Sequence, residues 1–427
     1  MRRKRVLYRI TAILLALILA AVAAELALRA FPEALLGEDL TAALYDPYNE
    51  SPFGMYFREP DARLNLMWPS QELKAYSHGY FWTHRTDARG FRNPEDRQAT
   101  GILLLGDSMI YGHGVEDDQT AASFLHRDYG DPVYNMARQG DCLYQHYRLL
   151  RLYLDELKPR TVLLFAFSND LTDLATTGAL AYADRPPEIE KYDYAAIRRS
   201  IALKSKNRPG VPFTSRFVLG RLAARGAADV ERPGKGAKGK KRSPVPRALR
   251  ELAMELQEKK TVDLDQAKQL VSEPQFRKRL ERGWSMLEEA DLARAALYYA
   301  RIIPDLHRRC REKGAELVLV NLALDQGEYW RANVDEAVAA MEKRRGIAAT
   351  KEAREYVAGV MYEARVKMAA QAGSLIAEVA ADDGIELLDL SALFTDGDNF
   401  LEDDGHLSET GHRRLAEKLH GFLSRKK

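Results

Sequence analysis

Four short segments of this sequence carry groups that could take part in nucleophilic chemistry. The first is Gly106-Asp107-Ser108, which directly follows an apolar run of strand length. A serine at the end of a buried strand can present a hydroxyl, and a helix starting there would direct free N–H groups at a developing negative charge. Taken alone, the tripeptide is more simply explained as an ordinary turn whose serine caps a helix.

The other three segments each lie at or beyond the end of a further apolar run. Gly140 would let a backbone N–H approach a bound oxygen, although an ordinary turn also favours glycine. Asn169 offers an amide donor, or else it caps a helix. His406 comes shortly after two acidic residues, Asp403 and Asp404, a pattern also typical of a solvated turn.

The combination of these segments is more informative than any one of them. One hydroxyl, two further hydrogen-bond donors and an imidazole with a neighbouring carboxylate would form a complete acyl-transfer site. These groups can meet only if the preceding runs are neighbouring parallel strands, because the carboxyl ends of such strands lie at one edge of a sheet.

The alternation of apolar runs with helical stretches predicts such a sheet. Each run is apolar on both faces, as a covered parallel strand should be. Helix-like stretches such as 143–157 and 353–381 separate the runs, which indicates βαβ units. We therefore expect an α/β fold with a flavodoxin-like, doubly wound parallel sheet of five strands. The runs are 102–105, 133–136, 161–167, 316–322 and 385–390.

Two further regions depart from this pattern. Residues 30–98 have mixed composition, and we expect them to form a lead-in that packs on the main domain at 99–427. Residues 172–300 are far longer than an ordinary crossover and predict a large helical insertion. Within the insertion, 231–247 contains seven lysines and arginines and predicts a flexible basic loop, which either contacts an anionic lipid or polymer or stays solvated.

Residues 1–29 have the composition of a membrane-inserted helix. Four of the first five residues are basic, and no charge occurs in 10–24. A helix over 6–28 would be ~34 Å long, enough for a ~30 Å hydrocarbon core. The positive-inside rule then leaves the N-terminus in the cytoplasm and exports the rest. A cleaved signal peptide is the alternative, because Ala-Val-Ala at 21–23 fits a cleavage site, and it exports the main domain equally.

Composition and charge exclude several classes of protein. The chain has 427 residues, of which 46% are hydrophobic, so it is not wholly disordered. Its 64 basic and 62 acidic residues give a net charge of +2, which offers no argument for binding nucleic acid. Cys142 and Cys310 are too far apart in sequence for a zinc-finger or redox motif, and the histidines show no metal-ligand spacing.

In these segments the chain resembles the SGNH (GDSL) hydrolase superfamily. The four blocks of that superfamily match at Ser108, Gly140, Asn169 and the pair Asp403 and His406. The segments TDARGFRN at 86–93 and GDSMIYGHGVEDDQT at 106–120 are similar to those of its bacterial membrane-anchored members. The resemblance covers about 75–170 and 310–425, and it leaves the insertion unexplained.

The resemblance implies a serine hydrolase mechanism. Ser108 would attack an ester carbonyl, His406 would act as general base and then acid, and Asp403 would orient the imidazole. Asp404 is the alternative acid, because it has the D-x-H spacing of acetyltransferase relatives. Leu407 stands where many members have proline, which is a departure from the family pattern.

The resemblance also implies an oxyanion hole and a reaction that uses no metal or cofactor. The N–H of Ser108, the N–H of Gly140 and the side-chain amide of Asn169 would hold the oxyanion. No metal or organic cofactor would be required. His113 could touch substrate but is more typical of a surface turn, and Cys142 is a bystander because Ser108 has the better position.

These observations predict a serine ester hydrolase acting on O-acyl esters of carbohydrate or lipid. We expect it to be a single-pass protein of the bacterial inner membrane, with its catalytic domain outside the cytoplasm. One alternative keeps the fold but transfers the acyl group to an envelope or secreted polysaccharide, as an O-acetyltransferase does. A second alternative is a catalytically inert scaffold, which the complete set of site residues disfavours.

Overall fold

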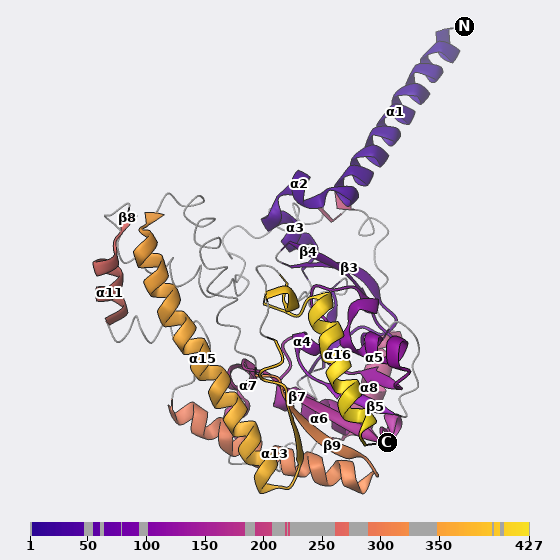
Figure 1. Ribbon diagram of the computed structural model, residues 1–427. Helices are drawn as coiled ribbons and strands as arrows, with labels where there is room; N and C mark the ends of the chain where they lie inside the picture. The colour runs from indigo at the N-terminus through magenta and orange to yellow at the C-terminus, as the bar shows by residue number, and fades with distance from the viewer. Residues whose placement is uncertain are drawn as a thin grey trace.

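The fold is built around one parallel sheet, with an apolar helix projecting from it at the N-terminus (Figure 1). The computed structural model describes residues 2–46, 54–59, 64–77, 79–93, 101–183, 193–206, 218–219, 221–222, 261–272, 289–323, 348–394, 397–401 and 405–426. The predicted basic loop at 231–247 lies outside these residues.

The central sheet has five parallel strands in the order β11-β9-β7-β5-β6. Counted along the chain, this order is 2-1-3-4-5, which is the flavodoxin-like arrangement. The predicted fold class is therefore confirmed. The strands are β5 (Ile102–Leu105), β6 (Val133–Asn135), β7 (Thr161–Ala166), β9 (Glu316–Asn321) and β11 (Glu386–Asp389).

Helices cover the sheet and explain why its strands are apolar on both faces. Two of them, α5 (Ala121–Tyr129) and α16 (Glu409–Ser424), pack against each other, and α5 also contacts β6. A second group contains α6 (Leu143–Leu157), α13 (Glu289–Glu312) and α15 (Lys351–Asp382), which contact one another or β9. Covered on both faces, a strand such as β5 buries all four of its residues.

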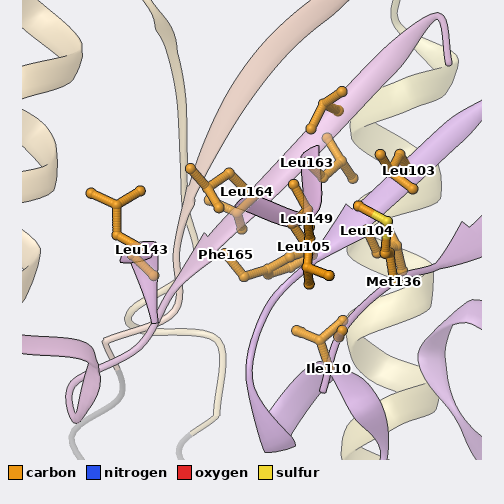
Figure 2. Close-up of a cluster of buried hydrophobic side chains, with 14 of the residues drawn as sticks. Leu103, Leu104, Leu105, Ile110, Met136, Leu143, Leu149, Leu163, Leu164 and Phe165 are labelled. Carbon is orange, nitrogen blue, oxygen red and sulfur yellow. The ribbon is translucent and has the colours of Figure 1, made fainter. Parts of the chain in front are cut away.

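The core lies where β5 and β7 meet the helices. Figure 2 shows this cluster of leucines with Ile110, Met136 and Phe165, and all of them are buried. Apolar burial of this kind is the main stabilising contribution to a fold of this size. It also fixes the carboxyl end of β5, from which the candidate site begins.

Residues before the sheet form two antiparallel hairpins. The first pairs β1 (Tyr56–Glu59) with β2 (Leu64–Met67), and the second pairs β3 (Glu72–Ser77) with β4 (Tyr80–Arg85). The segment after them is tied to the sheet at Asn135. The amide of Asn93 donates to the Asn135 carbonyl at 3.2 Å, and its oxygen accepts from the Asn135 N–H at 2.9 Å.

The described part of the insertion is helical, apart from one short strand. It contains α7 (Asp170–Thr176), α8 (Tyr194–Lys206), α11 (Leu264–Ser272) and the first part of α13. The two-residue strand β8 (Thr261–Val262) pairs in parallel with β10 (Ala348–Ala349), immediately before α15. In Figure 1, α11 and the start of α15 lie far from the central sheet.

The N-terminal helix α1 (Arg2–Ala30) is long and apolar enough to cross a membrane. The candidate span covers 23 residues with a mean hydropathy of 2.5, and a signal sequence would meet the same criterion. Two short helices follow, α2 (Pro32–Leu36) and α3 (Glu38–Leu44). Near the end of α1, the Glu25 carboxylate accepts hydrogen bonds from the N–H groups of Val218 and Leu219, so the helix is attached to the insertion.

Candidate active site

Ser108 lies at the junction between the central sheet and a short helix. It is the first residue of α4 (Ser108–Tyr111), and the Asp107 carboxylate caps this helix by accepting from the N–H of Met109 at 2.9 Å. A Cβ added at Gly106 would lie 2.6 Å from the side chain of Ile110, so only glycine permits this strand-to-helix turn. The serine is 8% exposed and is therefore almost enclosed.

The imidazole of His406 meets this hydroxyl from the other end of the chain. Its Nε2 lies 2.8 Å from Ser108 Oγ, although the two residues are 298 positions apart. A base at this distance can take the hydroxyl proton directly. The structure thus brings together the residues that the sequence analysis predicts as nucleophile and base.

Contacts on both sides hold the turn that carries His406. The carbonyl of His406 accepts from the N–H of Leu401 at 2.7 Å, and Phe400 pairs with Leu407 as an isolated bridge. Ser408 then caps α16 by accepting from the N–H of Gly411 at 3.2 Å.

Helix α16 is in turn fixed against α5. Buried His412 accepts a hydrogen bond from the N–H of Ala121 at the start of α5, at 3.2 Å. Burial lowers the pKa of His412 to about 3, so its ring is neutral and can accept this bond. A Cβ added at Gly411 would lie 2.2 Å from the carbonyl oxygen of Asn399. The absence of a side chain at Gly411 therefore lets the helix pack close to the preceding turn.

The two predicted acids, Asp403 and Asp404, lie outside the described residues, as does Glu402. The residues on either side are described. Gly405 has a positive φ of 74°, which favours glycine, and its N–H donates to the Leu401 carbonyl at 3.4 Å. The choice between the two acids therefore remains a prediction.

Gly140 and Asn169 lie on the loops after the two strands that flank β5. Gly140 has a φ of 71°, and its loop is joined to the Ser108 turn because the N–H of Arg138 donates to the Gly106 carbonyl at 3.2 Å. Asn169 directly precedes α7 without a capping side-chain hydrogen bond, and its amide donates to Asp173 at 2.7 Å. The predicted oxyanion donors thus come from the strands next to the nucleophile, and the amide of Asn169 is bound to a neighbouring carboxylate.

Buried carboxyl groups surround the nucleophile. Burial raises the pKa of Asp107, and the Met109 N–H, the charge of His406 and the side chain of Asn169 oppose that rise, so these groups lie close together. Burial also raises the pKa of Asp141 to about 7, although the Arg138 guanidinium pairs with it at 2.7 Å.

His113 is not on the surface, so the interpretation as a surface-turn residue is wrong. It is 2% exposed, and its ring is stacked on that of His406 with centroids 4.1 Å apart and an interplanar angle of 28°. The indole of Trp82 lies next to the ring of His113, with ring centroids 4.6 Å apart. The hairpin β3–β4 covers the turn, which the sequence of the turn could not reveal.

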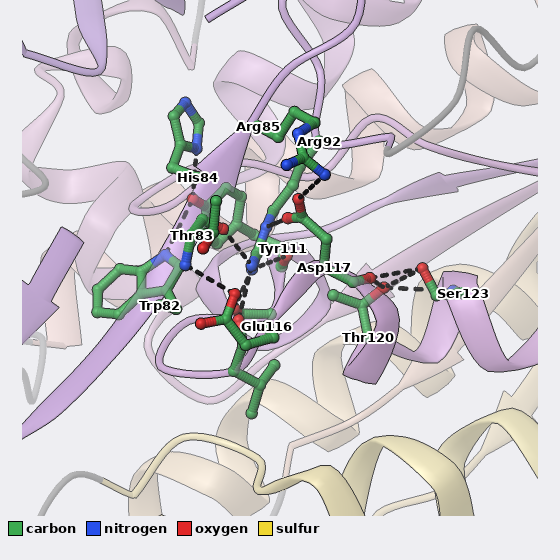
Figure 3. Close-up of polar contacts among 12 residues, drawn as sticks. Trp82, Thr83, His84, Arg85, Arg92, Tyr111, Glu116, Asp117, Thr120 and Ser123 are labelled. Atoms are coloured by element: carbon green, nitrogen blue, oxygen red, sulfur yellow. Dashed lines mark hydrogen bonds and ion pairs between the residues drawn. The ribbon is translucent and has the colours of Figure 1, made fainter. Parts of the chain in front are cut away.

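A buried guanidinium organises the turn around His113 (Figure 3). Arg92 forms an ion pair with Asp117 at 2.7 Å, and the exposed fractions of the two side chains are 0% and 8%. Tyr111 joins this turn to β4, because its hydroxyl lies 2.7 Å from Nδ1 of His84 and accepts from the Trp82 indole at 3.4 Å. Arg92 also donates to the carbonyl oxygens of Thr83, Tyr111, Gly112 and Val115.

Cys142 is suited to packing and not to nucleophilic chemistry. It is fully buried, and its thiol donates to the side-chain oxygen of Gln145 at 3.0 Å. Burial raises the pKa of this thiol well above its usual value, so it carries no thiolate at neutral pH. Within the described part of the chain, no cluster of three or more histidine, cysteine or acidic side chains is arranged to hold a metal ion.

Comparison with known proteins identifies the family to which the chain is similar. The model of the GDSL-like lipase/acylhydrolase family matches residues 102–419. No functionally curated protein matches the sequence.

Solved structures with a similar chain path are remote in sequence. A lipase/acylhydrolase from Enterococcus faecalis is 11% identical over 77% of this chain and 96% of its own, with a TM-score of 0.35. The esterase EstA from Pseudoalteromonas sp. is 9% identical over 76% of this chain and 97% of its own, with a TM-score of 0.30. A GDSL-like lipase from Bacteroides thetaiotaomicron is 9% identical over 78% and 93%, with a TM-score of 0.32.

Proposed function

The chain belongs to the GDSL-like lipase/acylhydrolase family, and from this premise we propose that it hydrolyses O-acyl esters with Ser108 as nucleophile and His406 as base. The observation that carries the proposal is the 2.8 Å contact between Ser108 Oγ and His406 Nε2. A serine hydroxyl is a weak nucleophile at neutral pH until an adjacent base accepts its proton. The proposed substrates are acyl esters of carbohydrates or lipids.

In the proposed reaction, Ser108 Oγ bonds to the ester carbonyl carbon while its proton passes to His406 Nε2. Collapse of the tetrahedral intermediate breaks the bond to the leaving alkoxide, which takes the proton from His406. Water then attacks the acyl-serine, again giving its proton to His406, and releases the carboxylic acid. Ser108 regains its proton in this last step, so the enzyme is restored without a metal or cofactor.

The oxyanion of each tetrahedral intermediate needs hydrogen-bond donors. We assign this role to the N–H groups of Ser108 and Gly140 and to the amide of Asn169. For Asn169 the assignment requires its amide to exchange Asp173 for the oxyanion when substrate binds. Loss of one such donor typically costs about 3–4 kcal/mol of transition-state stabilisation.

Asp403 is proposed to orient the imidazole of His406, with Asp404 as the alternative. Either carboxylate would fix the tautomer that leaves Nε2 free to accept the serine proton, and it would stabilise the imidazolium. Separate Asn variants at the two positions distinguish them, because only the acid that pairs with His406 should cause a large loss of kcat.

Helix α1 is proposed to anchor the enzyme in the bacterial inner membrane, with the catalytic domain outside the cytoplasm. Its apolar span of 23 residues is ~34 Å long at ~1.5 Å per residue, which matches a bilayer core. Four basic residues at 2–5 precede the span, which fits a cytoplasmic N-terminus. Membrane fractionation and the mass of the mature N-terminus test this, since a chain that begins after residue 23 would show cleavage instead.

Turnover of p-nitrophenyl acetate by the detergent-solubilised full chain tests the nucleophile. Ser108→Ala should lower the rate by at least ~10³-fold and abolish labelling by a fluorophosphonate, because both require the hydroxyl. Equal rates for the two proteins would remove Ser108 from the mechanism. Adding an oligosaccharide acceptor tests the O-acetyltransferase alternative, which predicts acetylated sugar in place of free acetate.

A further inference from the structure

Four aromatic and polar groups form a continuous series of contacts that ends at the candidate nucleophile. Trp82 contacts the ring of His113, the ring of His113 is stacked on that of His406, and His406 reaches Ser108 Oγ. The proposed mechanism uses only the last two of these residues.

The backbone around His113 has a conformation that serves to place this one side chain. Gly112 and Gly114, on either side, both have positive φ angles, of 85° and 79°, which other residues rarely adopt. A Cβ added at Gly114 would lie 2.2 Å from Leu401, so the turn packs directly against the segment that leads to His406. The stacked rings are thus held by chain segments that are themselves in contact.

Arg92 holds this turn in place by donating hydrogen bonds to the carbonyl groups of Gly112 and Val115, on both sides of His113. Burying a guanidinium is costly unless its donors are satisfied, and here Asp117 and these carbonyls satisfy them. A solvated surface turn has no need of such a buried cation. The arrangement therefore holds the imidazole of His113 in one place.

A stacked ring supplies what the hydrogen bond to serine lacks. The torsion that rotates a histidine ring about its Cβ–Cγ bond has broad minima, so the hydrogen bond at Nε2 does not by itself fix the ring plane. A second ring lying flat against it restricts that rotation. The π face of the second ring also attracts the positive charge that the base carries after it accepts the proton.

We propose that His113 is a positioning residue, which holds the His406 imidazole in the plane where Nε2 meets Ser108 and stabilises the imidazolium formed during acyl transfer. Trp82 supports His113 in that position. The inference rests on the proposed function of the Ser108–His406 pair. It assigns to His113 no contact with substrate.

Kinetics of three His113 variants of the full chain test this inference. His113→Ala removes the ring, and we expect kcat to fall about 10- to 100-fold with KM changed less than about threefold. His113→Leu fills the space without a flat ring and should show a similar loss. His113→Phe restores a flat ring and should recover kcat to within about threefold of the wild type.

A histidine stacked elsewhere provides the matched control. The ring of His420 stacks on Tyr129 at 4.2 Å, and His420→Ala should leave kcat unchanged. Thermal unfolding of each variant separates misfolding from loss of function, and the comparison of the Leu and Phe variants remains decisive if the Ala variant unfolds. Equal kcat values for folded Leu and Phe variants, or a loss confined to KM, would overturn the inference.

The rate of fluorophosphonate labelling at Ser108 separates this inference from the proposed function. If wild-type Ser108 is not labelled, the proposed function fails, and the role of His113 fails with it. If the wild type is labelled and His113→Leu is labelled at the same rate, only the positioning role fails. We expect slower labelling of His113→Leu, in proportion to its kcat, because labelling also requires His406 to take the serine proton.

Discussion

Replacing Arg92 by methionine would measure how strongly the fold around the candidate base depends on one buried cation. Methionine keeps most of the length and apolar surface of the side chain but removes every hydrogen-bond donor. The change removes the close ion pair of the buried Asp117 carboxylate and leaves it only a longer contact, at 3.9 Å, with half-exposed Arg85. It also removes the donors from four backbone carbonyl groups, those of Thr83, Tyr111, Gly112 and Val115.

The expected loss of stability follows from the uncompensated charge. Removing one partner of a buried ion pair typically costs about 3–5 kcal/mol, because the other partner stays desolvated. Arg199 provides the matched control, since it lies on the surface and pairs with exposed Asp193. Surface pairs contribute about 0–1 kcal/mol, so Arg199→Met should lower stability by no more than that.

The loss in Arg92→Met should also depend on pH. Burial raises the pKa of Asp117 in the folded protein, and Arg92 opposes that rise. Without Arg92 the folded pKa rises further above the unfolded value, so the folded state binds a proton more tightly and gains stability as the pH falls. The deficit relative to the wild type should therefore be largest at neutral pH and become smaller towards pH 5.

Urea unfolding of the solubilised chain, followed by tryptophan fluorescence at pH 7 and pH 5, gives the measurement. Arg92→Met/Asp117→Asn should recover part of the stability, because the unpaired charge is removed as well. An Arg92→Met protein within 1 kcal/mol of the wild type at pH 7 would refute the reasoning. A deficit that grows towards pH 5 would refute the assignment to Asp117.

Two further outcomes follow from the described contacts. Gly114→Ala should lower both stability and the rate of ester hydrolysis, because the new Cβ adds a collision with Leu401 to the ~1–2 kcal/mol cost of a positive φ. Gly130→Ala is its control, since the φ there is 70° with nothing within 4 Å of an added Cβ, and equal losses in the two variants would contradict the collision. Both cysteines should resist maleimide at pH 8 in the folded protein and react in guanidinium, because burial raises the pKa of Cys142 well above its usual value and that of Cys310 to about 12. A mass increase in the native protein would contradict this.

The sheet could be predicted from sequence because its strands are covered on both faces. The run at 102–105 coincides with β5, and the run at 161–167 extends one residue beyond β7. This strand order brings the segments that carry Ser108 and His406 to the same edge of the sheet, because the carboxyl ends of parallel strands share one edge.

The hairpin over the site could not be predicted in the same way. The inward face of β4 carries Trp82 and His84, and a buried histidine interrupts the alternation of apolar and polar residues that marks a half-covered strand. His84 is tolerated there because Tyr111 hydrogen-bonds to it, a contact between positions 27 residues apart. The burial of His113 was missed because it also depends on contacts with distant residues, Trp82 and His406. The glycines on either side of it were the only sequence sign of an unusual turn.

The two faces of the β3–β4 hairpin serve different neighbours. Its outer side chains, Tyr76 and Phe81, pack with Tyr45 at the end of α3, whose carbonyl also accepts from the N–H of Tyr76 at 3.0 Å. Its inner side chain Trp82 supports His113. A shortened chain without the apolar helix should therefore begin directly after α1 and keep 32–45, since trimming to residue 46 would remove the side chain that packs on the outer face of this hairpin.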